Sequence, residues 1–203
     1  MSQEKIILDL CGGTGSWSRP YAEAGYDVRV ITLPDHDVAT YKPPNGVYGI
    51  LAAPPCTMFS IARMTAKTPR DFEKGMETIL ACLKIIWKCQ GNGEYPALKF
   101  WALENPGSGF LKNFLGKPAH SFQPMMYGDK YTKLTSLWGF FKTPQPKPVR
   151  MEFGDDFASL GRDKGAEKEI PEGYKMPPDM TPRQVRRSIT PSGFAQAFFE
   201  SNQ

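Results

Sequence analysis

A cysteine stands directly after an apolar run that ends on two prolines, in the stretch "ILAAPPCTMF" at residues 50–59. The run is typical of a buried strand, so Cys56 would lie at the carboxyl end of that strand, where open parallel sheets bind ligands. A cysteine attacks as its thiolate, and its pKa of about 8.5 must be lowered by a cation or a helix amino terminus. Because a lone cysteine is more often a packing residue, Cys56 is a candidate nucleophile that needs partners.

Glycines follow a second apolar run in "KIILDLCGGTGSWS", residues 5–18. A strand that ends in such a loop and leads into a helix can bring its backbone close to a ligand. The spacing of Gly12, Gly13 and Gly15 differs from the dinucleotide pattern G-x-G-x-x-G, and the loop has no lysine for a phosphate-binding loop. The loop therefore favours a neutral or cationic adenosine ligand over a triphosphate, and a tight strand-to-helix turn is the alternative.

A carboxyl group ends a third apolar run in "FWALENP", residues 100–106. The strand would deliver Glu104 and Asn105 to the same sheet edge, and Pro106 would end the ladder. Apolar neighbours can raise the pKa of a carboxyl, which then works as a proton donor, whereas the alternative is a solvated glutamate at a strand end. A glycine loop, a thiol and a carboxyl would thus converge on one edge, and the combination is more specific than any part.

Strands and helices that would position these groups alternate along the first half of the chain. Strands are predicted from apolar runs at 5–10, 27–32, 48–53 and 99–105. Residues 18–26 predict a helix that ends at Gly25, and apolar residues at three- and four-residue spacing predict an amphipathic helix over 71–89. The alternation predicts an α/β fold whose mostly parallel sheet is covered on both faces.

The second half of the chain has a different pattern. Aromatic stretches at 120–128 and 135–141 are consistent with short antiparallel strands, and residues 142–182 indicate long loops because they are rich in proline and charge without a period. Residues 190–203 predict a closing helix. We therefore expect a core over 1–139, a small, irregular, loop-rich lobe over 140–185, and a C-terminal helix over 186–203 that returns to the core.

Composition limits the class of protein. The chain has 203 residues, of which 40% are apolar, and a net charge of +4 that permits a nucleic-acid partner without requiring one. Its four cysteines show no C-x-x-C spacing, so we expect free thiols in a reducing, cytoplasmic compartment and no metal site. The start "MSQEKIILDL" has no apolar segment long enough for export or membrane spanning, and we expect a monomer away from membranes.

The motifs "DLCGGTG" with Trp17, then "PPC", then "ENP", in this order, resemble those of the cytosine-5 DNA methyltransferases. The resemblance covers residues 5–106, and "TPSGFAQAFF" is more loosely similar to the family's closing helix. It implies a Rossmann-like methyltransferase fold that binds S-adenosylmethionine, with the core as the catalytic part and the lobe as the recognition part. The small size is similar to that of enzymes from phage and prophage genomes, which would act in the cytoplasm of a bacterial host.

The resemblance implies a role for each matching position. The Cys56 thiolate would attack carbon 6 of cytosine while Glu104 interacts with ring nitrogen 3. The residues implied to bind the cofactor are Asp9, Leu10, Cys11, Gly13, Gly15, Thr32, Asp37 and Pro55. Those implied for the substrate or DNA are Asn105, which with Pro106 would also hold Glu104, and Lys133, Thr135, Arg183, Arg186 and Arg187.

Several positions and the lobe depart from the family's pattern. Thr32 stands where the family places an acidic residue on the ribose hydroxyls, and Asp35 and Asp37 follow further on. Tyr131, Lys133 and Thr135 stand in the places of a glutamine and two arginines of the family, so a cation is kept only at Lys133. The short lobe predicts a target of at most about four base pairs, or a mismatched or single-stranded cytosine.

Other functions remain open at this point. The same chemistry on RNA or on a free pyrimidine nucleotide is one alternative, although no second cysteine stands near "ENP" as in RNA enzymes of related chemistry. A catalytically silent nucleic-acid-binding relative is another, although such a module has no need of both a thiol and a glutamate. The arginines of "PRQVRRS" could contact phosphates or form an ordinary solvated basic turn.

Overall fold

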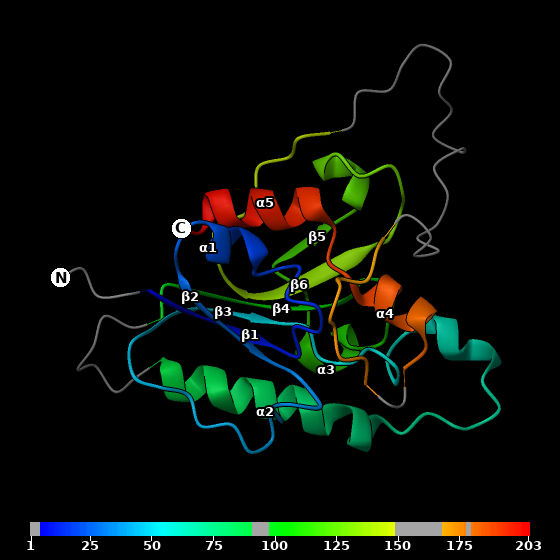
Figure 1. The fold of residues 1–203 in the computed structure, drawn as a ribbon. Helices are drawn as coiled ribbons and strands as arrows, with labels where there is room; N and C mark the ends of the chain where they lie inside the picture. The colour runs from blue at the N-terminus through cyan, green and yellow to red at the C-terminus, as the bar shows by residue number, and fades with distance from the viewer. Residues whose placement is uncertain (1–4, 91–97, 149–167, 178–179) are drawn as a thin grey trace, which may run out of the picture.

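The computed structural model describes residues 5–90, 98–148, 168–177 and 180–203. In this part of the chain one sheet has the strand order β2-β1-β3-β4-β6-β5 (Figure 1). The strands are β1 (Ile6–Leu10), β2 (Asp27–Ile31), β3 (Val47–Ala52), β4 (Phe100–Pro106), β5 (His120–Phe122) and β6 (Thr135–Phe140). Strands β1 to β4 are parallel, and β6 runs antiparallel between β4 and β5. The predicted mostly parallel α/β sheet is confirmed, and it is compatible with a Rossmann-like fold.

Helices cover both faces of this sheet, as the sequence predicts. The helical segments are α1 (Arg19–Glu23), η1 (Ile61–Thr65), α2 (Phe72–Cys89), α3 (Lys112–Leu115), η2 (Pro124–Tyr127), α4 (Pro182–Ser188) and α5 (Ser192–Ser201). Figure 1 shows α1 and α5 above the sheet and α2 below it. The chain is thus built in three layers around two apolar cores.

Alternating side chains of the central strands supply both cores. On β1, Ile7 packs into the core beneath α1 and α5, while Leu8 and Leu10 pack into the core against α2. On β3, Leu51 packs into the core beneath α1 and α5, and Ile50 packs into the core against α2. This alternation is the two-residue period of a strand buried on both faces, and it explains why the sequences of these strands are continuous apolar runs.

The long helix α2 begins and packs as its sequence pattern indicates. The Asp71 side chain caps it by accepting a hydrogen bond of 2.9 Å from the backbone N–H of Lys74. Its fully buried side chains are Ile79, Cys82, Ile85 and Ile86. None of the helices in the described residues is both long and apolar enough to cross a membrane.

Among the described residues of the C-terminal part, residues 182–188 differ from their prediction. The stretch "PRQVRRS", for which the sequence left a basic turn open, forms the helix α4. Thr181 and Gln184 build a capping box at its start, and Val185 is fully buried. Helix α4 crosses the expected boundary between residues 185 and 186, while residues 141–148 and 168–177 are free of helix and strand.

Candidate active site

The carboxyl ends of three parallel strands bring the predicted motifs together. Leu10 of β1 pairs with Ala52 of β3, and Ala52 pairs with Leu103 of β4, so the glycine loop and Cys56 leave the sheet at the edge where Glu104 lies within β4. In the sheet, β2 lies on one side of β1 and β3 lies on the other, so the strand order reverses at β1. Open α/β sheets bind ligands at the carboxyl ends of the strands where the order reverses. Figure 1 shows α3 and α4 near this edge.

A buried carboxylate shapes the glycine loop from beneath. Asp9 is fully buried, and its Oδ2 accepts a hydrogen bond of 2.6 Å from the Ser18 hydroxyl. A Cβ added to Gly12 would lie 2.3 Å from the Asp9 Cγ, so only glycine fits there. Gly13 and Gly15 have φ values of 55° and 67°, which favour glycine. The loop backbone therefore turns tightly at the end of β1, as the sequence predicts.

Burial of Asp9 should make the stability of the protein depend on pH. Desolvation raises the pKa of Asp9 from 3.8 to about 6, although Ser18 opposes the shift. The folded state therefore holds the proton more tightly than the unfolded state, and stability falls as pH rises from about 4 to 6. Above pH 6 this effect makes the free energy of unfolding about 3 kcal/mol lower than it is below pH 4.

We expect Asp9→Asn to be more stable than wild type at pH 8 and about equal to it at pH 4, because the amide carries no charge to desolvate. Urea unfolding of both proteins across this pH range measures the difference. Parallel pH profiles for the two proteins would contradict a proton held by Asp9 in the folded state.

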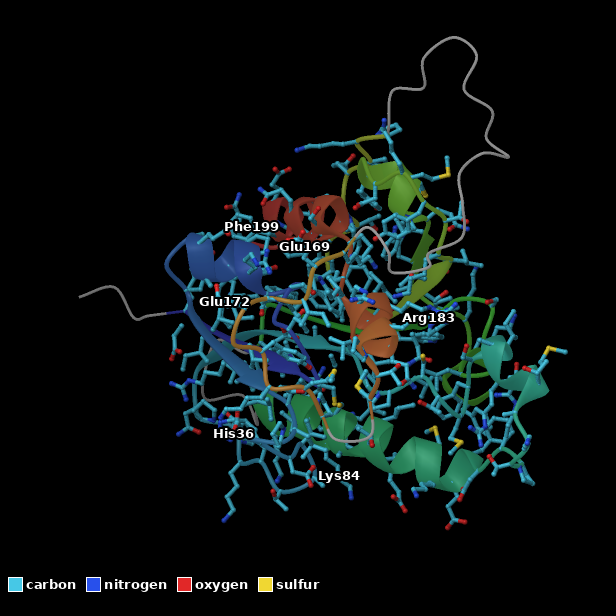
Figure 2. All side chains as sticks on the ribbon, turned by 45° about the vertical axis from the view of Figure 1, so that its right-hand side comes forward. His36, Lys84, Glu169, Glu172, Arg183 and Phe199 are labelled. Carbon is cyan, nitrogen blue, oxygen red and sulfur yellow. The ribbon has the colours of Figure 1, made fainter. Side chains whose placement is uncertain are left out.

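A cavity of about 350 Å³ lies beside the glycine loop. Its walls are Gly13–Gly15, Val30, residues 32–36, and residues 173–175 from the lobe. Thr32 lines it, as the cofactor assignment requires, and so do Asp35 and His36, the latter labelled in Figure 2. A volume of this size lies within the range of small-molecule sites.

Several residues implied to bind a cofactor lie outside this lining. The Asp37 carboxylate is exposed and accepts a hydrogen bond of 2.9 Å from the backbone N–H of Ala39. Leu10 is fully buried in the core, and the Cys11 thiol faces the thiol of Cys82 on α2. Pro55 is exposed beside Cys56. The cavity therefore offers Asp35 rather than Asp37 as its carboxylate.

Cys56 sits in a turn with charged groups of both signs around it. Its carbonyl accepts hydrogen bonds from the backbone N–H groups of Phe59 and Ser60, at 2.9 and 2.8 Å. Burial raises the pKa of the Cys56 thiol and the charge of Glu104 raises it further, whereas Lys133 and Arg187 act in the opposite direction. Thr135 of β6 pairs with Pro106 at the end of β4, which brings Lys133 to the same edge as Glu104. We refer to Cys56, Glu104, Lys133 and Arg187 as the cluster.

Asn105 fixes the position of the two motifs relative to each other. It is fully buried, and its Nδ2 donates a hydrogen bond of 3.1 Å to the carbonyl of Pro54. This bond joins the end of β4 to the turn that carries Cys56. Asn105 therefore holds the turn that carries Cys56, while its expected roles of holding Glu104 and contacting the substrate stay predictions.

Lys133 and helix α4 meet at the same edge. The Lys133 Nζ donates a hydrogen bond of 3.2 Å to the Arg187 carbonyl, and its backbone N–H donates one of 2.8 Å to the Gln123 side chain. Thr135 is only 2% exposed, and its hydroxyl donates to the Lys133 carbonyl at 2.9 Å. Thr135 therefore orders the segment that carries Lys133 rather than facing open space.

The three arginines of α4 do not share one environment. Arg183 is exposed, as Figure 2 shows with its label on α4, and Arg186 is half-buried. Arg187 is exposed and acts on the Cys56 thiol. The sequence did not predict this proximity, nor did it predict Tyr174 and Lys175 at the cavity. The capping box from Thr181 to Gln184 was the available signal for the helix.

Comparison with known proteins adds no assignment to this geometry. No model of a known protein family matches the chain, and no curated protein matches it. Across residues 5–90, 98–148, 168–177 and 180–203, no cluster of histidine, cysteine, aspartate and glutamate could hold a metal ion.

Proposed function

We propose that this protein is a DNA methyltransferase that transfers a methyl group from S-adenosylmethionine to carbon 5 of cytosine. One observation carries the proposal: neighbouring parallel strands bring a thiol, a carboxyl and a glycine loop that lines a cavity to the same edge of the sheet. The order of the three motifs along the chain supports the same assignment. This gives the cluster a nucleophile, a group for the base, and an adjacent place for the methyl donor.

The residues of the cluster can perform the first half of the reaction. Carbon 6 of cytosine becomes electrophilic when ring nitrogen 3 is protonated or strongly hydrogen-bonded, and Glu104 supplies that interaction. The raised pKa keeps the Cys56 thiol protonated at neutral pH, so the thiol must give its proton to solvent water as it attacks. Lys133 and Arg187 stabilise the thiolate by their charge. The bond from sulfur to carbon 6 leaves carbon 5 nucleophilic.

The second half restores the base and the enzyme. When bound, S-adenosylmethionine supplies an electrophilic methyl group on its sulfonium, which carbon 5 accepts. Carbon 5 then gives its proton to solvent water, the electrons of that bond restore the double bond to carbon 6, and the Cys56 sulfur leaves as a thiolate that takes up a proton from water. Cys56 is half-buried in its turn, so a cytosine can reach it only when flipped out of a duplex or already single-stranded.

The residues around the cavity suit an adenosyl group. The glycine loop lets a ligand approach the backbone, and it carries no lysine for a triphosphate. Thr32 and Asp35 offer oxygen atoms for the hydroxyl groups of a ribose. Lys175 also lines the cavity, but its charge is paired with Asp35 at 2.9 Å.

Two exposed arginines of α4 have different proposed roles. Arg183 is exposed on α4 and suits a phosphate contact, which adds affinity without sequence information. Arg187 acts on Cys56, so its charge belongs to the chemistry. The lobe over residues 140–185 is short, which fits a short or single-stranded target.

Transfer of a tritiated methyl group from S-adenosylmethionine to DNA, RNA and free cytidine nucleotides, assayed in parallel, tests this function. We expect label in DNA at carbon 5 of cytosine. Label confined to RNA or to nucleotides would move the same chemistry to another substrate, and absence of label from all three would contradict a methyltransferase.

Thr32 provides a separate test of the cofactor site. We expect Thr32→Glu to tighten binding of S-adenosylhomocysteine by at most about 1.5–3 kcal/mol, because a carboxylate forms stronger hydrogen bonds to ribose hydroxyls than a hydroxyl does. Isothermal titration calorimetry measures the change.

The neighbouring carboxylate supplies the control for this experiment. If Thr32→Glu leaves affinity unchanged or weaker while Asp35→Asn lowers it, then Asp35 is the ribose partner and Thr32 is not. Asp37→Asn should bind as wild type does, since the Asp37 side chain is outside the cavity lining.

A further inference from the structure

A segment of the lobe forms one wall of the cavity. Gly173, Tyr174 and Lys175 face the glycine loop on one side and the residues that follow β2 on the other. In Figure 2 the segment is drawn in orange and carries the label of Glu172. The sequence predicts DNA recognition for this lobe, and these three residues lie instead where the cofactor is proposed to bind.

Contacts at both ends hold the segment on the core. The Lys168 Nζ donates a hydrogen bond of 2.9 Å to the Ile189 carbonyl and lies 4.8 Å from the centre of the Tyr131 ring. At the other end, the Lys175 Nζ forms an ion pair of 2.9 Å with the Asp35 carboxylate. Along the chain, Tyr174 lies between Lys168 and Lys175, which make these contacts.

A tight turn directs Tyr174 inward. The Tyr174 backbone N–H donates a hydrogen bond of 3.1 Å to the Pro171 carbonyl, and Gly173 has a φ of 74°, which favours glycine. Tyr174 is half-buried, whereas Gly173 and Lys175 on either side of it are exposed. The turn therefore buries one side chain between two exposed neighbours.

The Tyr174 hydroxyl reaches the glycine loop. Its oxygen lies 3.8 Å from the position that a Cβ on Gly13 would occupy. Burial raises the pKa of Tyr174, so its hydroxyl keeps its proton at neutral pH and can donate a hydrogen bond. An amphipathic ring with a donor at its tip suits a ligand that is apolar on one side and polar on the other.

We propose that Tyr174 contacts the adenosyl cofactor, donating a hydrogen bond from its hydroxyl to the part of the ligand that lies on the glycine loop. This inference rests on the proposed function, and it adds a cofactor-binding residue from the lobe to those of the core. Tyr174 lines the cavity together with residues of the glycine loop.

Calorimetric titration of the full chain with S-adenosylhomocysteine tests the contact. We expect Tyr174→Phe to weaken binding roughly fivefold, the loss of one neutral hydrogen bond, and Tyr174→Ala to weaken it about thirtyfold by removing the wall as well. The matched control is Tyr48→Phe, because Tyr48 lies near the amino end of β3, away from the cavity, and should bind as wild type does.

The outcomes separate this inference from the function on which it rests. Wild type that binds S-adenosylhomocysteine while both Tyr174 variants bind it equally well would overturn the contact and leave the function standing. Wild type that binds no S-adenosylhomocysteine would overturn the proposed function and the contact with it. Urea unfolding of each variant shows that a lost affinity is not a lost fold, and if Tyr174→Ala unfolds, the affinity of Tyr174→Phe alone decides between the outcomes.

Discussion

Cys56→Ala should abolish methyl transfer to DNA while the protein stays folded and binds S-adenosylhomocysteine as wild type does. The thiol provides the bond to carbon 6, and without that bond carbon 5 is not nucleophilic enough to take a methyl group. The turn itself should persist, because its hydrogen bonds use the Cys56 carbonyl and not the thiol. The cavity should persist too, since Cys56 is not part of its lining. Incorporation of tritiated methyl groups and calorimetry measure the two properties separately.

Cys89→Ala is the matched control for this variant. Cys89 is half-buried, as Cys56 is, and it is the last residue of α2. The first residue of α2, Phe72, lies close to the turn that carries Cys56, because its ring is 5.8 Å from the ring of Phe59. The length of the helix separates the two thiols by roughly 25 Å. Cys89→Ala should transfer methyl groups at the wild-type rate. Residual transfer by Cys56→Ala above the background without enzyme would mean that another group attacks the base.

Glu104→Gln should slow methyl transfer by roughly a hundredfold or more, which is the usual contribution of a general acid, with little change in affinity for S-adenosylhomocysteine. Glutamine keeps the shape of the side chain but has no carboxyl group that could take up a proton and share it with ring nitrogen 3. Single-turnover rates with enzyme in excess over DNA isolate this step from product release. An equal loss of affinity for S-adenosylhomocysteine would place Glu104 in the cofactor site instead.

The pKa of the Cys56 thiol provides a second, independent measurement of the effect of Glu104→Gln. The charge of Glu104 raises the pKa of Cys56, so its removal should lower that pKa. Alkylation of Cys56 in Glu104→Gln should therefore reach its half-maximal rate at a lower pH than in wild type. The control is Glu23→Gln, because Glu23 is exposed at the end of α1 and should leave both the rate of methyl transfer and the alkylation profile unchanged.

The sequence alone predicts those parts of the site that follow directly from strands. Cys56, Glu104 and the glycine loop each lie at or just after the end of an apolar run, and parallel strands bring their carboxyl ends to one edge. The strands themselves could be predicted for the same reason, because buried parallel strands have continuous apolar runs. Residue order therefore sufficed to expect the thiol near the carboxyl.

Contacts between segments far apart in the chain could not be predicted in this way. Helix α4 packs Val185 into the molecule, and the Arg187 carbonyl accepts a hydrogen bond from Lys133, yet no local pattern links "PRQVRRS" to "PPC". Tyr174 lies at the glycine loop through contacts made by Lys168 and Lys175, in a segment without a period. Thr135 was expected at the substrate, but it is the first residue of β6 and is buried. It is buried because β6 lies between β4 and β5, which the sequence alone does not show.

A DNA oligonucleotide that contains 5-fluorocytosine tests the central claim most directly. Fluorine cannot leave carbon 5 as a proton does, so the reaction in the presence of S-adenosylmethionine should stop with the enzyme bonded to carbon 6. Mass spectrometry of the digested complex should then find the modified nucleotide on the peptide that contains Cys56. An adduct on Cys11, Cys82 or Cys89, or methylation of ordinary cytosine with no adduct on the fluorinated base, would contradict the account.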